Sequence, residues 1–474
     1  MSTEDRLIDL AEHPPPPMAG IQTTVLLPGQ RDDVSATVAL ATSGLFEDYL
    51  SYQRPGRRWF AGNTHSAVVL GHRLTITTPA TRAQHVPISV RPLRQLGQAI
   101  RQILPPGQRA FGYLTFELAH LAAGSSVVSS PHPLAHFLVP QVEICWTTTG
   151  TQITSTIPTL LDAVIDIVRA AAPCPPPPTT PLDLDPPGHR RRYEHAVAQI
   201  IAAIHDRALH KAIISRRVTV PFTVDLPRSY AAGLGRNTPA RSFLLQLGQR
   251  RCAGFSPETL VEVSATGGVC TQPLAGTRPL LHDPIEDLRL RQELEWDVKE
   301  CYEHLISVRL ATEELRTVCR PEGVLVRDLL TVKQRGTVQH LGSTVTGQLR
   351  TGHTAWDALE TLFPAVTASG ISKHQALTAI ATTEQDHREL YAGAICMLDA
   401  TGALDSAVVL RSIFQQSHHT WLRAGAGIVA DSQPAREYDE TTNKLRSAAH
   451  CLVPANKPPH ALTMTPAGNH HTPH

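Results

Sequence analysis

The stretch WLRAGAGIVADSQPAREYDETTNKL, from Trp421 to Leu445, contains the pattern from which the fold can be worked out. It opens with a strand-like run over 421–424, passes through Gly425-Ala426-Gly427, and enters a helix expected over 436–451. Glycines at a strand end let backbone N–H groups approach an anion closely, although a bulge or turn is the ordinary explanation. The stretch therefore predicts a strand, a glycine turn and a charged helix in succession.

The helix expected over 436–451 carries a row of charged side chains. Glu437, Glu440 and Lys444 are spaced i, i+3 and i+7 and therefore share one helix face. An earlier helical stretch holds Glu300 and Glu303 at the same i, i+3 spacing. Two carboxylate pairs from two helices could converge on one hard divalent cation, and oxygen ligands favour Mg²⁺. The alternative, which the spacing alone favours, is two solvated faces with surface ion pairs.

Other candidate binding groups lie at the ends of predicted elements. Lys211 opens a strand whose next residues are apolar, and burial lowers the pKa of a lysine, which suits a general base. The alternative is an edge-strand lysine that reaches water. Gly276-Thr277 carries the same ambiguity between anion contact and turn, and Ser369-Gly370 is expected to cap the helix that follows or to bind an anion at its N-terminus.

Outward from these segments, strands and helices come in groups rather than in strict alternation. From about 23 to 146, short alternating runs separated by Gly, Pro and Asn are typical of an antiparallel sheet. Later strands are expected at 212–220, 242–247, 259–264, 268–273, 336–349, 394–398, 407–415 and 421–425, and helices at 157–172, 191–207, 283–317 with one break, 371–383 and 436–451. This grouping predicts an α+β fold in which large antiparallel β-sheets form the core and helices flank them.

The proline distribution suggests how the chain is divided. Residues 173–188 are too rich in proline for regular structure, so they are either a linker or a surface loop within one domain. We expect a scaffold part over 21–172 and a binding part over 189–455, together forming one compact unit. The segments 1–20 and 456–474 are expected to be a disordered arm and tail.

Composition excludes several functional classes. Lys and Arg total 43 and Asp and Glu total 42 of the 474 residues, so the net charge is +1 and no basic field exists to hold nucleic acid. No apolar run is long enough to cross a membrane, and the acidic N-terminus does not resemble a signal peptide. The eight cysteines are scattered without a C-x-x-C pair. We therefore expect a cytoplasmic protein with reduced thiols.

Several longer segments, taken in order, resemble the chorismate-utilising enzyme family, which includes anthranilate, aminodeoxychorismate, isochorismate and salicylate synthases. The segments are HKAIISRRV from His210, GFSPETLVEV from Gly254, TQPLAGTRPL from Thr271, DVKECYEHLISVR from Asp297, TVQHLGSTVTG from Thr337, LFPAVTASGISK from Leu362, RELYAGAICMLD from Arg388, LRSIFQ from Leu410, and the opening stretch from Trp421. The resemblance is dense over about 191–454. Many motifs in one order are far more specific than any single motif.

The resemblance implies roles for particular residues. By analogy with the family, Glu303 and Glu440 would hold the Mg²⁺ cofactor that chelates the ring carboxylate of chorismate, with Glu300 and Glu437 in or near its coordination shell. Family likeness assigns the remaining substrate-binding roles to Lys444 and the Gly425–Gly427 backbone at the ring carboxylate, to Tyr391 and Arg411 at the enolpyruvyl carboxylate, and to Gly276, Thr277, His340 and Thr367 around the ring.

Within the family, the resemblance is greatest to the salicylate synthase branch. Lys211 would activate water and Glu258 would protonate the departing hydroxyl. Ala275 stands where the aminodeoxychorismate branch carries a nucleophilic lysine, so amination at C4 is disfavoured. The N-terminal tryptophan-binding signature usual in anthranilate-type chains is not seen, and no glutaminase subunit is expected. Alternatives are an isochorismate synthase, an anthranilate-type or aminodeoxyisochorismate-type subunit, and a relic that binds a ligand without turnover. The family likeness also suggests a monomer.

Overall fold

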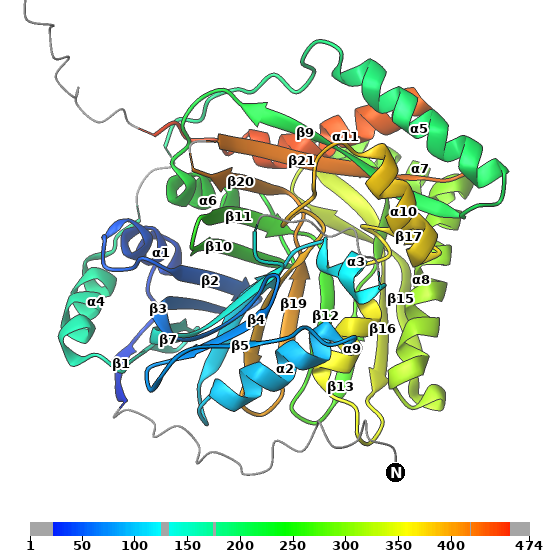
Figure 1. Cartoon of the computed structure of the whole chain (residues 1–474). Coiled ribbons are helices and arrows are strands. Elements are labelled where there is room, and N and C mark those ends of the chain that lie inside the picture. The colour runs from blue at the N-terminus through cyan, green and yellow to red at the C-terminus, as the bar shows by residue number, and fades with distance from the viewer. Residues whose placement is uncertain (1–21, 125–131, 174–176, 418, 456–474) are drawn as a thin grey trace, which may run out of the picture.

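The computed structural model describes residues 22–124, 132–173, 177–417 and 419–455. Within this part of the chain, 21 strands form one hydrogen-bonded network, and every strand pair in it is antiparallel. Helices flank the network on its outer faces (Figure 1). The predicted α+β architecture of large antiparallel sheets flanked by helices is confirmed. The expected arm over 1–20 and tail over 456–474 lie outside the described residues.

The strand network has two arms that share long strands β3 and β7. The first arm runs in the order β8 (Gly150–Ser155), β7 (Ala135–Trp146), β3 (Arg57–Leu70), β2 (Tyr49–Arg54), β10 (Arg241–Leu247), β11 (Arg250–Ser256), β20 (Ser412–Gln416), β21 (His419–Ile428), β9 (Lys211–Val220) and β17 (Gly370–Ile371). β1 (Thr23–Pro28) pairs with β8, and β4 (Leu74–Thr78) and β5 (Thr81–Val86) extend from β3. This arm ends at the strand that begins with Lys211.

The second arm leaves β7 in another direction. Its order is β6 (Arg109–Leu114), β18 (Ala394–Asp399), β19 (Leu404–Val408), β12 (Thr259–Val263), β13 (Gly268–Thr271) and β16 (Val338–Gln348), and β16 also pairs with β14 (Leu274–Pro279) and β15 (Leu325–Arg335). Pairs such as β10 with β2 and β18 with β6 join the two parts of the chain on either side of the Pro-rich segment. The described residues of that segment contain no helix or strand.

The helices cover the outer faces of both arms (Figure 1). They are α1 (Asp33–Thr42), α2 (Pro92–Ile103), α3 (Leu118–Ala122), α4 (Pro158–Ala170), α5 (His189–His205), α6 (Leu226–Leu234), α7 (Pro284–Trp296), α8 (Val298–Val318), α9 (Ala355–Leu362), α10 (Lys373–Thr383) and α11 (Pro434–Ala449), with a short 3₁₀ turn at Pro321–Gly323. α11 packs on β21 beside α5, and α8 packs on β14 and β16. Two helices from different arms are thus brought toward each other.

Alternation along the strands divides the core in two. On β10, Phe243 and Leu245 join an apolar cluster that also contains residues of α2, α8, α9 and α10, while Leu244 joins the cluster beneath α1, α4, α6 and α11. On β2, Tyr52 faces the first cluster and Tyr49 the second. Successive side chains of a strand point to opposite faces. The first arm is therefore buried on both sides, which makes it a rigid support for the residues at its end.

Two expectations about local structure are wrong. The strand predicted over 407–415 is broken between β19 and β20, because Arg411 adopts a positive φ of 50° and turns the chain. The residues Gly425-Ala426-Gly427 do not form a turn after β21 but continue the strand, paired with Ser215 to Ile213 of β9. Both differences bear directly on the candidate site, because these residues line it.

Candidate active site

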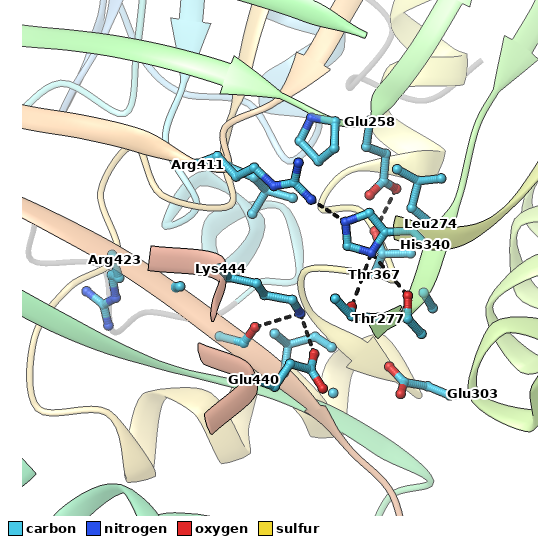
Figure 2. A pocket seen from close by; sticks show the side chains of 18 of the residues that line it. Glu258, Leu274, Thr277, Glu303, His340, Thr367, Arg411, Arg423, Glu440 and Lys444 are labelled. Carbon is cyan, nitrogen blue, oxygen red and sulfur yellow. Dashed lines mark hydrogen bonds and ion pairs between the residues drawn. The ribbon is translucent and has the colours of Figure 1, made fainter. Parts of the chain in front are cut away.

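A pocket lies where β9, β21 and α11 meet the connection between β11 and β12, together with β14, β16 and α8 (Figure 2). The structure brings together most of the residues predicted to bind substrate. Those lining the pocket are Glu258, Gly276, Thr277, Glu303, His340, Thr367, Tyr391, Arg411, Gly425, Gly427, Glu440 and Lys444. Of the remaining predicted residues, Lys211 contacts Glu303, whereas Glu300 and Glu437 lie behind the pocket wall and face a second cavity.

Glycines in β21 make room for the pocket. A Cβ at Gly427 would collide with Glu303 Oε1, and a Cβ at Gly425 would lie 2.8 Å from the Ile214 carbonyl oxygen and 3.0 Å from the Tyr391 hydroxyl oxygen. The two glycines are two residues apart on the strand and so face the same side. They leave room on the strand for Glu303 of α8 and for Tyr391, so their role is close packing rather than a turn.

Lys211 is fully buried at the start of β9. Its Nζ lies 3.0 Å from Glu303 Oε1 and donates a hydrogen bond of 3.0 Å to Ser307 Oγ. Burial opposes ionisation of Glu303, but Lys211 and Lys299 outweigh it and lower the pKa of that carboxyl. The expectation of a buried lysine is correct, and the tertiary structure adds a carboxylate partner that the sequence analysis did not identify.

Glu258 is the buried acid of the pocket. It follows β11, where residues 257 and 258 connect to β12, and Thr367 Oγ1 donates a hydrogen bond of 2.6 Å to Glu258 Oε1. Burial raises the pKa of Glu258 to about 8, against the opposing effects of Thr367 and Lys211. The side chain can therefore hold a proton at neutral pH, which is the state a general acid requires.

His340 on β16 lies at the centre of a polar cluster. Its Nδ1 donates to the Gly276 carbonyl oxygen at 3.1 Å and lies 3.1 Å from Thr277 Oγ1, while its Nε2 meets the Arg411 guanidinium. Burial and the charge of Arg411 hold the pKa of His340 well below its usual range. The imidazole is therefore neutral and accepts a hydrogen bond through Nε2. The turn at Arg411 is what aims the guanidinium at the pocket.

The expected cap at Ser369 is absent. Ser369 Oγ donates to the Ala365 carbonyl oxygen at 2.8 Å, and α10 begins at Lys373 after Ser372. The loop instead presents the neighbouring Thr367 to the pocket. Ser369 therefore stabilises the backbone that carries Thr367 and does not bind an anion at a helix N-terminus.

The four glutamates come from two helices whose starts are fixed by the sequence. Asp297 ends α7 and caps α8 by accepting a hydrogen bond of 3.1 Å from the Glu300 N–H, so that Glu300 and Glu303 lie in the first turns of α8. Glu437 and Glu440 lie in the first half of α11. The two helix faces converge, so the solvated alternative does not apply to Glu300, Glu303 and Glu437, which are buried.

Two lysines lie among these carboxylates. Lys299 Nζ is 3.1 Å from Glu437 Oε1 and 3.2 Å from Glu300 Oε1, and Lys444 Nζ is 2.6 Å from Glu440 Oε1 while donating to the Gly425 carbonyl oxygen at 3.0 Å. Among the described residues, no group of three or more acidic, His or Cys side chains is arranged to hold a metal ion. Lys299, which the sequence analysis passed over, separates the carboxylates.

The carboxylates nevertheless fit a divalent cation. Glu437 is 2% exposed, yet its Oε2 has no hydrogen-bond partner, and burial together with the charge of Glu440 raises its pKa to about 7. Burial and Glu440 also raise the pKa of Glu300. The negative charge of carboxylates crowded together in this way is not fully compensated by the neighbouring lysines. Sites rich in carboxylate oxygens bind hard divalent cations.

Tyr391 rests on a buried charge network that the sequence analysis did not identify. The guanidinium carbons of Arg388 and Arg423 lie 5.6 and 5.7 Å from the centre of its ring, and Glu384 bridges the two arginines. In Figure 2 the Arg423 guanidinium lies apart from Lys444 and Glu440, which form their own ion pair, whereas Arg423 pairs with Glu384. Alternation along β21 could have identified Arg423, because it shares a strand face with Gly425 and Gly427.

Comparison with known proteins identifies the family. The family model described as chorismate binding enzyme matches residues 49–450. This chain belongs to that family. The resemblance drawn from the sequence motifs is therefore confirmed, as is the expectation of a chorismate-utilising enzyme fold.

Individual members of the chorismate binding family agree with this assignment. A salicylate synthase from Mycolicibacterium paratuberculosis is 39% identical over 441 residues, which are 89% of this chain and 93% of that protein. Anthranilate synthase component 1 from Streptomyces coelicolor is 42% identical over 236 residues, covering 50% of this chain and 46% of that protein. The crystal structure of anthranilate synthase component I from Streptococcus pneumoniae matches 84% of this chain and 93% of that chain, with a TM-score of 0.71 and 26% identity.

Proposed function

We propose that this protein is a salicylate synthase, which converts chorismate through isochorismate to salicylate and pyruvate. The observation that carries the proposal is that the pocket is lined by the buried Glu258, whose pKa is raised to about 8, and by Glu303, which contacts the fully buried Lys211. The similarity to a salicylate synthase along nearly its whole length supports the same activity.

In the proposed first step, Lys211 takes a proton from a water molecule that attacks C2 of the chorismate ring. Glu258 donates its proton to the hydroxyl that departs from C4, so the products are isochorismate and water. An acid and a base acting in one transition state each contribute roughly 10²–10⁴-fold to the rate. The Lys211 Nζ, which would accept that proton, lies 3.0 Å from Glu303 Oε1.

In the proposed second step, the enolpyruvyl arm of isochorismate takes the hydrogen from C2, the C3–O bond breaks, and pyruvate leaves salicylate behind. This step needs no external base, but it needs the arm held over the ring. Arg411 and Tyr391 are suited to hold the carboxylate of the arm, because a guanidinium offers two parallel N–H donors. The neutral His340 keeps the Arg411 guanidinium in place through Nε2.

Magnesium is the proposed cofactor, and Glu300, Glu303, Glu437 and Glu440 are its proposed ligands. When bound, it would supply positive charge for the ring carboxylate of the substrate. The chain contributes Lys444, whose position between Glu440 and the Gly425 carbonyl oxygen directs an ammonium toward the same end of the pocket.

The position of Ala275 supports this branch of the family. It lies on β14 in the pocket lining, is only 7% exposed and carries no group that could attack the ring. This argues against amination at C4 through a lysine nucleophile. We also propose a single-chain enzyme that acts without a glutaminase, which the similarity to a salicylate synthase over 93% of that protein supports. A cytoplasmic location is also part of the proposal, supported by the cysteines of the described residues, which are all free thiols as in a reducing compartment. Among the helices described, none combines the length and apolar character needed to cross a bilayer.

The proposal is tested by incubating the purified protein with chorismate and Mg²⁺ and resolving the products over time. Salicylate and pyruvate should appear in equal amounts, with isochorismate only as a transient and no incorporation of ammonium. Accumulation of isochorismate without pyruvate would make the protein an isochorismate synthase. An aminated product formed with ammonium would assign it to the amination branch.

A further inference from the structure

Two adjoining cavities reach the carboxylates of α8 and α11. Glu303 lines the substrate pocket, whereas Glu300 and Glu437 line a separate outer cavity of about 380 Å³. Glu440 and Thr277 line both. A cation in the outer cavity could therefore reach the carboxylates without passing through the space that the substrate occupies.

The outer cavity is strongly acidic. Its acidic lining residues are Glu293, Asp297, Glu300, Asp431, Glu437, Asp439 and Glu440, and its basic lining residues are Arg278, Lys299 and Arg436. Asp431 and Asp439 are exposed at its outer part, and Glu300 and Glu437 are buried at its inner end. A cleft lined mainly by one sign of charge raises the local concentration of counter-ions and their association rate.

A polar atom without a partner points to a ligand at the inner end. Glu437 is 2% exposed and lines the outer cavity, but its Oε2 accepts no hydrogen bond. Its Oε1 is 3.1 Å from Lys299 Nζ. A buried carboxylate oxygen left unpaired is costly, so the site lacks a donor or a cation beyond the one that Lys299 supplies.

Lys299 occupies the middle of the cluster as a built-in cation. Besides Glu437 Oε1, its Nζ lies 3.2 Å from Glu300 Oε1 and 3.9 Å from Glu303 Oε2. Lys299 lines the outer cavity and not the substrate pocket.

We infer that the divalent cation enters through the outer cavity and displaces the Lys299 ammonium from the carboxylates. This inference rests on the proposed function only in taking the glutamates as metal ligands. Lys299 is a positioning residue: it holds the carboxylates together without metal and competes with the metal for them. Its side chain is 23% exposed and can withdraw toward the cavity mouth.

The first experiment measures the association rate of Mn²⁺ with the full-length protein by stopped flow, without substrate. Asp431→Lys reverses a charge at the outer cavity. The control, Glu313→Lys, makes the same change on an exposed part of α8 that lies about 20 Å along the helix from Glu300. We expect Asp431→Lys to slow association roughly fivefold at about 10 mM ionic strength, with the effect shrinking as salt is added. Equal rates in the two variants would refute the outer entrance.

The second experiment measures Mn²⁺ affinity by calorimetry and the melting temperature without metal. Lys299→Met should bind Mn²⁺ at least about tenfold more tightly and melt lower without metal, because the carboxylates lose their internal cation. Lys299→Arg retains the charge and should keep near-native affinity. If Lys299→Met lowers the melting temperature but leaves affinity unchanged or weaker, Lys299 is only structural and the displacement is wrong.

These binding measurements separate the inference from the proposed function. If the native protein binds Mn²⁺ with the expected dependence on Asp431 and Lys299 but forms no salicylate, the outer entrance is supported and the proposed activity is wrong. If the protein forms salicylate in a metal-dependent way but Asp431→Lys does not change the rate of Mn²⁺ association, the proposed activity is supported and the outer entrance is wrong. Native protein that binds no divalent cation refutes both the entrance and the metal site.

Discussion

Replacement of Glu258 by glutamine tests whether burial tunes this carboxyl for acid catalysis. The pKa of about 8, against an ordinary value of 4.5, corresponds to roughly 5 kcal/mol of preference for the protonated form in the folded protein. Because the folded pKa is the higher one, the stability that this group contributes is complete below about pH 4.5 and is lost as the pH rises toward 8. Glutamine has no proton to lose, so it removes this dependence.

The expected result has two parts. From about pH 5.5 to 8.5, the unfolding free energy of Glu258→Gln should rise relative to native protein by on the order of 3 kcal/mol. Turnover of chorismate should fall by roughly 10²–10⁴-fold, and native turnover should decline as the pH passes about 8, because the acid loses its proton.

Denaturant unfolding of both proteins without metal, followed by circular dichroism at several pH values, measures the stability difference. Glu322→Gln removes an exposed carboxylate from the turn after α8 and serves as the control, with no comparable pH-dependent gain expected. A stability difference between native and Glu258→Gln that stays constant from about pH 5.5 to 8.5 would show that burial does not raise this pKa. Near-native turnover in the variant would remove Glu258 as the acid.

Three further substitutions test the other proposed roles. Lys211→Ala should slow isochorismate formation from chorismate by at least about 10²-fold but should still convert added isochorismate to salicylate. A near-normal rate of isochorismate formation in this variant would show that Lys211 is not the base. Glu440→Gln should nearly abolish turnover and weaken Mn²⁺ binding in calorimetry while leaving the circular dichroism spectrum unchanged; full native activity in excess EDTA would contradict the metal site. Arg411→Ala should raise the KM for chorismate and increase the isochorismate released per salicylate formed, and an unchanged product ratio would show that Arg411 does not hold the enolpyruvyl arm.

Local patterns determined the elements that carry the site. The i, i+3 spacing of Glu300 with Glu303 and of Glu437 with Glu440 follows from helix geometry, and it holds in α8 and α11. The break within 283–317 is also local, because Asp297 caps the second helix. The motifs and their order were enough to recognise the family, because each motif is a short run of neighbouring residues that can be identified without the tertiary structure.

The contacts that decide the chemistry join residues far apart in the chain. Lys211 at the start of β9 meets Glu303 on α8, and Thr367 meets Glu258 just before β12, because the ends of the two sheet arms pack together. No local pattern states that Lys211 has a carboxylate partner or that burial raises the pKa of Glu258, because both depend on what packs around the side chain.

The sequence by itself thus determined which residues carry charge, which helix faces they share and which family the chain resembles, since these depend on neighbours a few residues away. Tertiary structure alone decided that Lys299 lies between Glu300 and Glu437, that the strand expected over 407–415 turns at Arg411, and that two cavities meet at Glu440. The physical reason is that burial, ion pairing and cavity shape arise from the packing of the two sheet arms against each other, and that packing is a property of the whole chain.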